Sequence, residues 1–383
     1  MNYKNELLAV AGLALVVLLL GGCAISTPIP TATLTQSIAS AVPTVAATAL
    51  PTEFSSLNPS PRGYFSMAYD SKADQVILFG GLTGNEGLPS SCNGETWAYN
   101  VAANRWTQMK PPSGPTVRDS TEMAYDSKAD RVILFGGALE YGKVVVLADT
   151  WAYDFNTNTW TEMANGPANY GFGSIVYDAQ ADRIILYGGS DATYVGFSPD
   201  TWAYNYNTNT WTDMKPSISP PARNTQVLVY DTKANRVIMW GGDTGWEERI
   251  ALRDENVWSY DYDTNTWQEI KPPQGTEVWP DTRDWASAAY DSKSDRMIMS
   301  GGYYQAGTDE TWAYDYNTNT WTKLEPNKAG GMLSASAMVY SSAADRFILF
   351  GGLVGNSADT DYTGETWSYD FNTNTWTDVT PHN

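Results

Sequence analysis

The chain has 383 residues, of which 42% are hydrophobic, and it carries 43 acidic side chains against 23 Lys plus Arg. The hydrophobic fraction excludes a wholly disordered chain, and the net charge of −20 argues against binding to nucleic acid or to an anionic membrane surface. The single histidine, His382, is the second-to-last residue, which excludes His-dependent triads, His-ligated copper or iron and most zinc sites.

The N-terminal residues carry the pattern of an export signal. Lys4 precedes an apolar run of 14 residues, 7–20, which is typical of a signal-peptide core and too short to span a bilayer comfortably. Leu20-Gly21-Gly22-Cys23 follows, and small residues before a cysteine resemble the bacterial lipoprotein lipobox. The resemblance implies that residues 1–22 are a lipoprotein signal peptide, that Cys23 is lipidated, and that the protein is extracytoplasmic and anchored to the cell envelope. The alternative is an ordinary signal peptide or an uncleaved anchor that contains a cysteine.

The segment after the lipobox predicts a stalk. Residues 24–52 hold 21 Ala, Ser, Thr or Pro among 29 positions and no charged side chain. Such a segment has too few bulky apolar groups to offset its chain entropy, so we expect residues 23–52 to be a disordered, partly extended stalk. Beyond it, Cys92 is the one remaining thiol, so no intramolecular disulfide is expected there.

From residue 53 to the end, one pattern recurs six times. Each copy has a short apolar run, a Gly-Gly pair, a Trp-x-Tyr and a second Trp nine residues after the first. The glycine pairs are Gly80-Gly81, Gly136-Gly137, Gly188-Gly189, Gly241-Gly242, Gly301-Gly302 and Gly351-Gly352. The tryptophan pairs are Trp97 and Trp106, Trp151 and Trp160, Trp202 and Trp211, Trp258 and Trp267, Trp312 and Trp321, and Trp367 and Trp376. This period and pattern resemble the kelch repeat.

The resemblance covers residues 53–383 and implies an all-β fold, a six-bladed kelch-type β-propeller with four antiparallel strands per blade. In the second repeat, β-branched and aromatic residues independently predict strands near 121–125, 131–135, 150–153 and 159–163. We expect the twelve repeat tryptophans to pack in the core rather than to stack on sugars. Residues 53–57 resemble the end of a repeat, so they are either an extra edge strand or the lead-in to the first blade.

The spacing of the repeats distinguishes two faces of the propeller. The distance from the first-strand Tyr to the second Gly is 12 residues in all six repeats, and Trp to Trp is always nine. Gly-Gly to Trp varies from 10 to 16 residues, and the second Trp to the next Tyr from 17 to 23. Successive turns of an antiparallel meander alternate between ends, so the constant turns should share one face and the variable links the other. Variable loops on a rigid scaffold favour recognition, so we expect the binding site on the variable face.

Four of the six repeats carry an arginine seven residues before the first-strand tyrosine: Arg62, Arg118, Arg223 and Arg283. The third repeat has Tyr170 there and the sixth Leu333. We expect these arginines to ring the channel mouth on the variable face, where guanidinium groups would bind a carboxylate. The resemblance to kelch proteins that bind acidic peptides or sialic acid implies the same role. The alternative is that each arginine pairs with a neighbouring acid or carbonyl group.

Aromatic residues outside the repeat pattern form a second set of candidate ligand-binding residues. Trp246, Trp279 and Trp285, with Tyr303 and Tyr304, fall in or beside the variable links of the fourth and fifth repeats, whereas Trp240 lies in an apolar strand and should be core. Exposed aromatic rings near arginine suit sugar rings or peptide side chains. The alternative is that they cover their own loops.

The sequence predicts no catalytic residue, no cofactor and no metal site. Kelch copper oxidases need histidine ligands, which this chain lacks. A sialic-acid epimerase or mutarotase of this fold would need arginine and a carboxylate, for which Glu247, Glu248, Asp281 and Asp284 are candidates. Asp359, Asp361 and Glu365 could bind calcium through their carboxylate oxygens. Residues 315–319 have part of the spacing of a calcium-binding loop, but we expect them to form an Asx turn.

We therefore expect a surface-anchored binding module with a monomeric head, which recognises a glycan or an acidic peptide or protein through the variable face. The alternatives are a sugar-isomerising or other glycan-modifying enzyme, and a scaffold that uses the sides of the blades for protein contacts. The lipid anchor would be the one contact with the membrane, and no nucleic-acid partner is expected.

Overall fold

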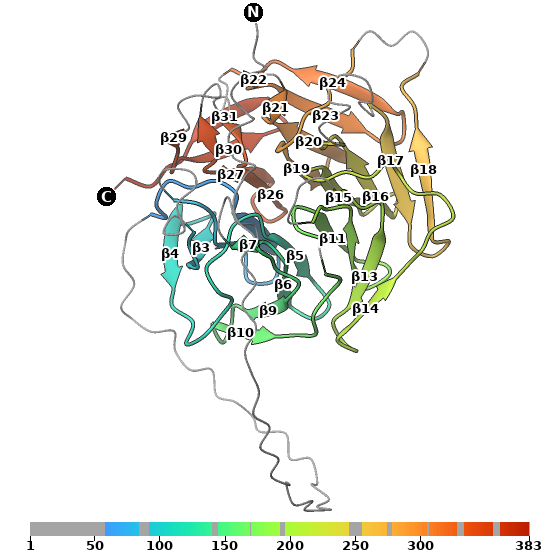
Figure 1. Ribbon diagram of the computed structural model, residues 1–383. Helices are drawn as coiled ribbons and strands as arrows, with labels where there is room; N and C mark the ends of the chain where they lie inside the picture. The colour runs from blue at the N-terminus through green and yellow to red at the C-terminus, as the bar shows by residue number, and fades with distance from the viewer. Residues whose placement is uncertain are drawn as a thin grey trace, which may run out of the picture. The chain divides into compact units, whose positions relative to one another are not determined.

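The computed structural model describes residues 58–83, 92–139, 145–168, 170–191, 196–244, 255–273, 278–304, 306–327, 333–354 and 361–382. All of them belong to one compact unit, Thr52–Asn383. The regular structure in these ranges is entirely β, with 31 strands. Six four-stranded antiparallel sheets are arranged around a central axis (Figure 1), so the predicted all-β, six-bladed propeller is confirmed.

Each of the first three blades takes its four strands from one continuous stretch of chain. Blade 1 consists of β1 (Ser66–Asp70), β2 (Gln75–Phe79), β3 (Thr96–Asn100) and β4 (Arg105–Met109). Blade 2 consists of β5 (Glu122–Asp126), β6 (Arg131–Phe135), β9 (Thr150–Asp154) and β10 (Thr159–Glu162). Blade 3 consists of β11 (Ser174–Asp178), β12 (Arg183–Tyr187), β13 (Thr201–Asn205) and β14 (Thr210–Asp213). In blade 2, each strand boundary lies within one residue of the prediction.

The other three blades repeat this order. Blade 4 consists of β15 (Val227–Asp231), β16 (Arg236–Trp240), β17 (Val257–Asp261) and β18 (Thr266–Ile270). Blade 5 consists of β19 (Ser287–Asp291), β20 (Arg296–Ser300), β23 (Thr311–Asp315) and β24 (Thr320–Leu324). Blade 6 consists of β26 (Ala337–Ser341), β27 (Arg346–Phe350), β30 (Thr366–Asp370) and β31 (Thr375–Asp378). The first strand of every blade is innermost, and these six strands contact one another in a closed ring.

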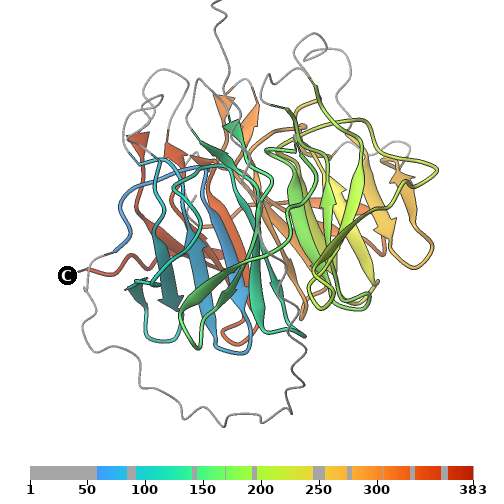
Figure 2. The same ribbon diagram turned by 60° about the horizontal axis from the view of Figure 1, so that its bottom comes forward.

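Short additional strands occur in the variable links, most of them between a Gly-Gly pair and a third strand and one, β25, between blades 5 and 6. β7 (Ala138–Leu139) pairs with β8 (Val145–Val146), and β21 (Tyr303–Tyr304) pairs with β22 (Ala306–Gly307). A three-stranded sheet contains β25 (Leu333–Ser334), β28 (Leu353–Val354) and β29 (Asp361–Tyr362). Figure 2 shows these pieces at one face of the disc, opposite the tight turns, as the two classes of spacing predict.

The constant spacings follow from side chains that close the tight turns. In blade 1, Asp70 Oδ1 accepts hydrogen bonds from the backbone N–H groups two and three residues on, both at 3.0 Å. The hydroxyl of Tyr69 donates to Asp74, which adopts a φ of +54°. Asp315 makes the predicted Asx turn between the third and fourth strands of blade 5, because its Oδ1 accepts from the N–H of Asn317 at 2.9 Å. A turn built on a fixed set of bonds admits no change of length.

The Gly-Gly pair is required where neighbouring blades meet. Gly80 has a φ of +76°, and a Cβ on it would lie 2.7 Å from the carbonyl oxygen of Arg118 in the next link. Gly81 donates its N–H to that same oxygen at 3.0 Å. Both the left-handed backbone and the close approach of another chain segment exclude a side chain here.

Tryptophan side chains join each blade to the preceding one. Nine of the twelve repeat tryptophans are buried and three are half-buried, so core packing is confirmed. In five blades the indole Nε1 of the second tryptophan donates to a threonine of the preceding blade's third strand. These pairs are Trp106 with Thr366, Trp160 with Thr96, Trp211 with Thr150, Trp267 with Thr201 and Trp376 with Thr311, at 2.8–3.1 Å. For Trp321 of blade 5, the equivalent position in blade 4 is Val257 instead of threonine, and Trp321 Nε1 has no hydrogen-bond partner in the described structure.

Blades 1 and 6 close the ring without exchanging a strand within the described ranges. The Trp106–Thr366 bond crosses this junction, and the rings of Phe65 and Phe350 pack with centroids 5.5 Å apart. Asn58, just before blade 1, donates to the carbonyl oxygen of Pro381 at 2.7 Å. The predicted signal peptide, stalk and possible edge strand, residues 1–57, lie outside the described residues. Where the chain is described, it forms no helix with the length and apolar character needed to cross a membrane.

Candidate functional site

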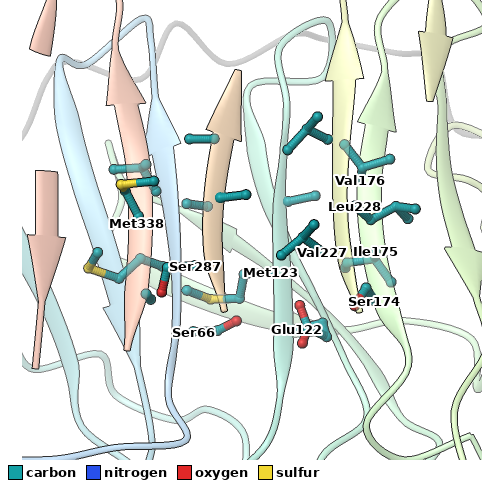
Figure 3. Close-up of a pocket in the computed structure, with 18 of the residues that line it drawn as sticks. Ser66, Glu122, Met123, Ser174, Ile175, Val176, Val227, Leu228, Ser287 and Met338 are labelled. Carbon is teal, nitrogen blue, oxygen red and sulfur yellow. The ribbon is translucent and has the colours of Figure 1, made fainter. Parts of the chain in front are cut away.

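The six inner strands enclose a central channel with a volume of about 460 Å³. This volume lies in the range of small-molecule sites. Its wall is mainly apolar or hydroxyl-bearing, with tyrosines at the constant end. Side chains labelled in Figure 3 include Ser66, Met123, Ser174, Ile175, Val176, Val227, Leu228, Ser287 and Met338.

Glu122, the first residue of β5, carries the one carboxyl group among the residues that line the channel, and the lining includes no Lys, Arg or His. Figure 3 shows Glu122 and Ser66 pointing toward one another across open space. The channel walls leave the Glu122 side chain half-buried, and no described residue gives it a hydrogen bond or an ion pair. Desolvation by this burial raises the pKa of Glu122 to about 8.

A ring of left-handed residues forms the mouth of the channel. Every blade has a non-glycine residue with φ between +50° and +62° just before its inner strand. This residue stands two positions before the one that corresponds to Glu122 in that blade. This mouth ring consists of Tyr64, Ser120, Phe172, Thr225, Trp285 and Ala335. Four of the six members donate their backbone N–H to the carbonyl oxygen of the preceding member, for example Ser120 to Tyr64 at 2.6 Å and Thr225 to Phe172 at 2.9 Å. Strained backbone of this kind persists where the surrounding structure enforces it.

Three aromatic side chains of the mouth ring meet over the channel. Tyr64, Phe172 and Trp285 come from blades 1, 3 and 5, whereas the alternating blades contribute small side chains. The Trp285 ring lies edge-on to Tyr64, with centroids 4.8 Å apart, and edge-on to Phe172, at 6.2 Å. We call these three residues the aromatic plug. Trp285, a predicted ligand-binding residue, is therefore part of the mouth.

The four arginines do not ring the channel mouth as predicted. Their exposed fractions are 0–3%, and none of them lines the channel. Each guanidinium instead turns into its own blade, where it donates to backbone carbonyl groups. Arg62, for example, donates from Nε to Ser60 O at 3.0 Å and from Nη1 to Gly80 O at 3.1 Å. Buried carbonyl groups need donors, and a guanidinium with five N–H bonds satisfies several of them at once.

Acidic residues two positions before the third-strand tryptophan pair with these arginines. The ion pairs are Arg62 with Glu95 at 2.7 Å, Arg118 with Asp149 at 2.6 Å, and Arg283 with Glu310 at 2.7 Å. Burial alone would raise the pKa of Glu310, but hydrogen bonds from Lys323, Arg283 and Trp312 outweigh it and lower this pKa to about 2. In the third repeat the hydroxyl of Tyr170 donates to Asp200 instead. These contacts agree with the alternative interpretation of the sequence, in which each arginine pairs with a neighbouring acid or carbonyl group instead of a ligand.

The variable face carries the exposed apolar side chains of the described structure. Five large hydrophobic residues are 40–58% exposed: Val117, Val145, Ile218, Val278 and Val354. All five lie in the links whose length varies between repeats, either between blades or between the Gly-Gly pair and the third strand. The tight turns of the opposite face have no such residue within the described ranges.

Comparison with known proteins assigns the family. A family model described as the Attractin/LZTR1 beta-propeller matches residues 47–303, which is more than half of the chain. The chain belongs to this family. A KLHDC2/KLHL20/DRC7 Kelch-repeats domain model also matches residues 225–383, which supports the kelch resemblance. Kelch propellers generally mediate protein–protein interactions, so the fold is consistent with a protein-binding module.

Curated relatives of this kelch propeller are distant. The chain is 25% identical over 294 residues to mouse multiple epidermal growth factor-like domains protein 8, covering 73% of this chain and 10% of that protein. It is 26% identical over 243 residues to Kelch domain-containing protein 10 of Xenopus tropicalis, covering 60% of this chain and 55% of that protein. The kelch propeller therefore spans about half of one relative and a tenth of the other.

Two of the remaining predicted aromatic residues, Trp279 and Tyr303, are half-buried in the described structure. Trp279 donates from Nε1 to Glu255 O at 2.7 Å, just before the third strand of blade 4, and packs on Trp321 of blade 5, so it covers the junction of these two blades. Tyr303 is half-buried, and its backbone exchanges two hydrogen bonds with Asp284, next to Trp285. Cys23, Trp246, Glu247, Glu248, Asp359 and the side chains of Tyr304 and Asp361 lie outside the described residues. The described part of the chain has no group of three His, Cys, Asp or Glu side chains placed to hold a metal ion.

Sequence reasoning missed three residues of the mouth and channel of this propeller. Tyr64 and Phe172 stand two residues after the arginine position, where the repeats alternate between large and small side chains. Glu122 stands where the other repeats have Ser66, Ser174, Val227, Ser287 and Ala337. An alignment of the six repeats with one another would have shown both signals.

Proposed function

We propose that the propeller is a protein-binding module whose partner docks on the variable face. The observation that carries this proposal is that the strongly exposed large hydrophobic side chains of the described structure all lie on that face. Apolar side chains on the variable loops of a rigid scaffold are suited to the core of a protein interface. Membership of a family whose propellers generally bind proteins supports the same conclusion.

The charge of the chain favours a neutral or basic partner. With a net charge of −20, the protein attracts cationic surfaces and repels acidic ones over several ångströms. A sialylated glycan or an acidic peptide would instead need accessible cationic groups. The four arginines predicted for that role are buried and bonded, so their geometry gives no support to an anionic ligand.

Charged substitutions on the two faces of the propeller test this proposal. Val145→Asp with Val354→Asp places two charges in the exposed apolar set, and Ala102→Asp places one in an exposed constant turn as the control. The partner would be cross-linked in the cells that make the protein, purified, and titrated against each variant. We expect the double variant to bind at least tenfold more weakly and the control to bind like wild type. Equal binding by all three, or selective binding of a sialylated or uronic-acid glycan on an array, would contradict the proposal.

We also propose that Cys23 anchors the protein to a membrane through covalent lipid. The support is the apolar run followed by Leu20-Gly21-Gly22-Cys23. Expression in a bacterial host with a labelled fatty acid should give a labelled, membrane-bound protein, and Cys23→Ala should abolish the label. A wild-type protein that is secreted without label would contradict the anchor.

A further inference from the structure

The described lining of the central channel contains one carboxyl group, that of Glu122, and the fold does not use it. At the positions equivalent to Glu122, the other blades have serine, valine or alanine, so the packing of the inner strands does not require a carboxyl there. Acids that the fold does use have partners: Asp70 is buried and accepts backbone N–H groups, and Asp149 binds Arg118. Glu122 is half-buried and has no such partner among the described residues, and a carboxyl that is partly removed from water without a partner costs stability. A residue of this kind in a cavity is a candidate for ligand binding.

The surroundings of Glu122 suit one class of ligand. The lining holds no cation that would attract an anionic molecule, and the single carboxyl with hydroxyl groups lacks the several carboxylate or carbonyl ligands that Ca²⁺ requires. The volume of about 460 Å³ fits a small organic molecule. Ser66 faces Glu122, and the hydroxyl of Ser174 already donates to Gln226 O at 2.6 Å, so its own oxygen is available to accept.

The mouth of the channel adds aromatic rings to the same site. Glu122 lies two residues beyond Ser120 of the mouth ring, which corresponds to about 7 Å along a strand. The aromatic plug of Tyr64, Phe172 and Trp285 thus lies near the carboxyl level of the channel. Aromatic rings and a carboxylate together are the chemistry that recognises alkylated ammonium groups.

We propose that the central channel binds a small organic cation, an alkylated ammonium compound, whose charge pairs with Glu122 beneath the aromatic plug. The ammonium replaces the missing partner of the carboxylate, and the apolar wall contacts the alkyl groups. This site is distinct from protein docking on the outer part of the variable face and does not depend on it.

Choline is a suitable probe because 3,3-dimethyl-1-butanol has the same shape without the charge. Isothermal titration of the full chain at pH 8.5 should detect choline binding, with at least tenfold weaker binding of the neutral alcohol. Glu122→Gln should weaken choline binding at least tenfold. Glu162→Gln, which removes an exposed carboxylate from the outer strand of the same blade, is the matched control and should bind like wild type.

The wild-type chain provides a second test that needs no variant. Burial raises the pKa of Glu122 to about 8, so below this pH choline must displace a proton from the carboxyl. Choline affinity should therefore fall about tenfold per pH unit between pH 7 and 5.5, with proton release visible as a dependence of the heat on the buffer. Failure of choline, methylammonium and tetramethylammonium to bind at 8.5 would overturn the proposal. So would equal binding by Glu122→Gln, or binding of the alcohol as tight as that of choline.

Discussion

Replacing Val257 with threonine should stabilise the propeller by supplying the missing Trp–Thr hydrogen bond between blades 4 and 5. Val257 is fully buried, and Trp321 Nε1 is a buried donor without a partner in the described structure. Threonine has nearly the same shape as valine, and five equivalent threonines in this chain accept from a tryptophan at 2.8–3.1 Å. The substitution therefore introduces a hydroxyl at a site where the geometry of the repeat already provides its partner.

The expected gain in the free energy of unfolding is about 1 kcal/mol. A buried hydrogen bond contributes about 0.5–1.5 kcal/mol net, and pairing Trp321 also removes the cost of an unsatisfied donor, about 1–3 kcal/mol. Against these gains stands the cost of desolvating the new hydroxyl and losing a methyl group, about 1–2 kcal/mol. Thr201→Val, the reverse change, should cost about 1–3 kcal/mol because it leaves Trp267 Nε1 unpaired.

Urea denaturation measures these differences as shifts in the midpoint at constant m. Val237→Thr is the matched control, because Val237 is equally buried on the neighbouring strand β16. The Val237→Thr variant should be less stable than the wild type, because the described structure provides no unpaired donor for the hydroxyl of the new threonine. If Val257→Thr destabilises the protein as much as Val237→Thr does, the reasoning that the absent bond weakens this blade junction is refuted.

Three further substitutions test the packing of the links and the ion pairs. Gly80→Ala should destabilise the fold by more than about 2 kcal/mol in urea, because its left-handed backbone and the carbonyl of Arg118 at 2.7 Å exclude a Cβ. Arg118→Met should cost about 3–5 kcal/mol in the same assay, because it leaves Asp149 without its buried partner. The pKa of Glu310 is lowered to about 2, so the stability it contributes is present above pH 4.5 and lost as the pH falls toward 2. Glu310→Gln should therefore flatten the dependence of the urea midpoint on pH between 4.5 and 2.

The fold could be predicted from the sequence because six copies of one pattern constrain it. The constant distances fix the tight turns, and residues such as Asp70 and Asp74 show in the structure why those turns keep one length. The Gly-Gly pairs marked the ends of the second strands, where the structure shows left-handed backbone against the next link. Local chemistry that repeats six times leaves few alternatives for the topology.

The direction of the arginine side chains could not be predicted in the same way. The sequence does predict where the four arginines stand in the fold, which is the point at which a variable link enters an inner strand. Whether Arg62 points toward the channel or into its blade depends on Glu95, which lies 33 residues later and on another strand. The sequence does contain a trace of this pairing, because the third repeat replaces the arginine with Tyr170 and retains an acid, Asp200, as its partner.

Departures from the repeat carry information that the repeat itself does not. Val257 departs by removing a hydroxyl, and the structure shows the consequence as one unpaired indole, which is a local loss of stability. Glu122 departs by adding a carboxyl to a channel wall of small and apolar side chains, and no described residue compensates for it. A missing bond weakens a fold without giving it a new capacity, whereas an unpaired carboxyl group in a cavity costs stability and persists most readily where a ligand supplies the partner. The same comparison of repeats thus assigns Val257 to stability and Glu122 to binding.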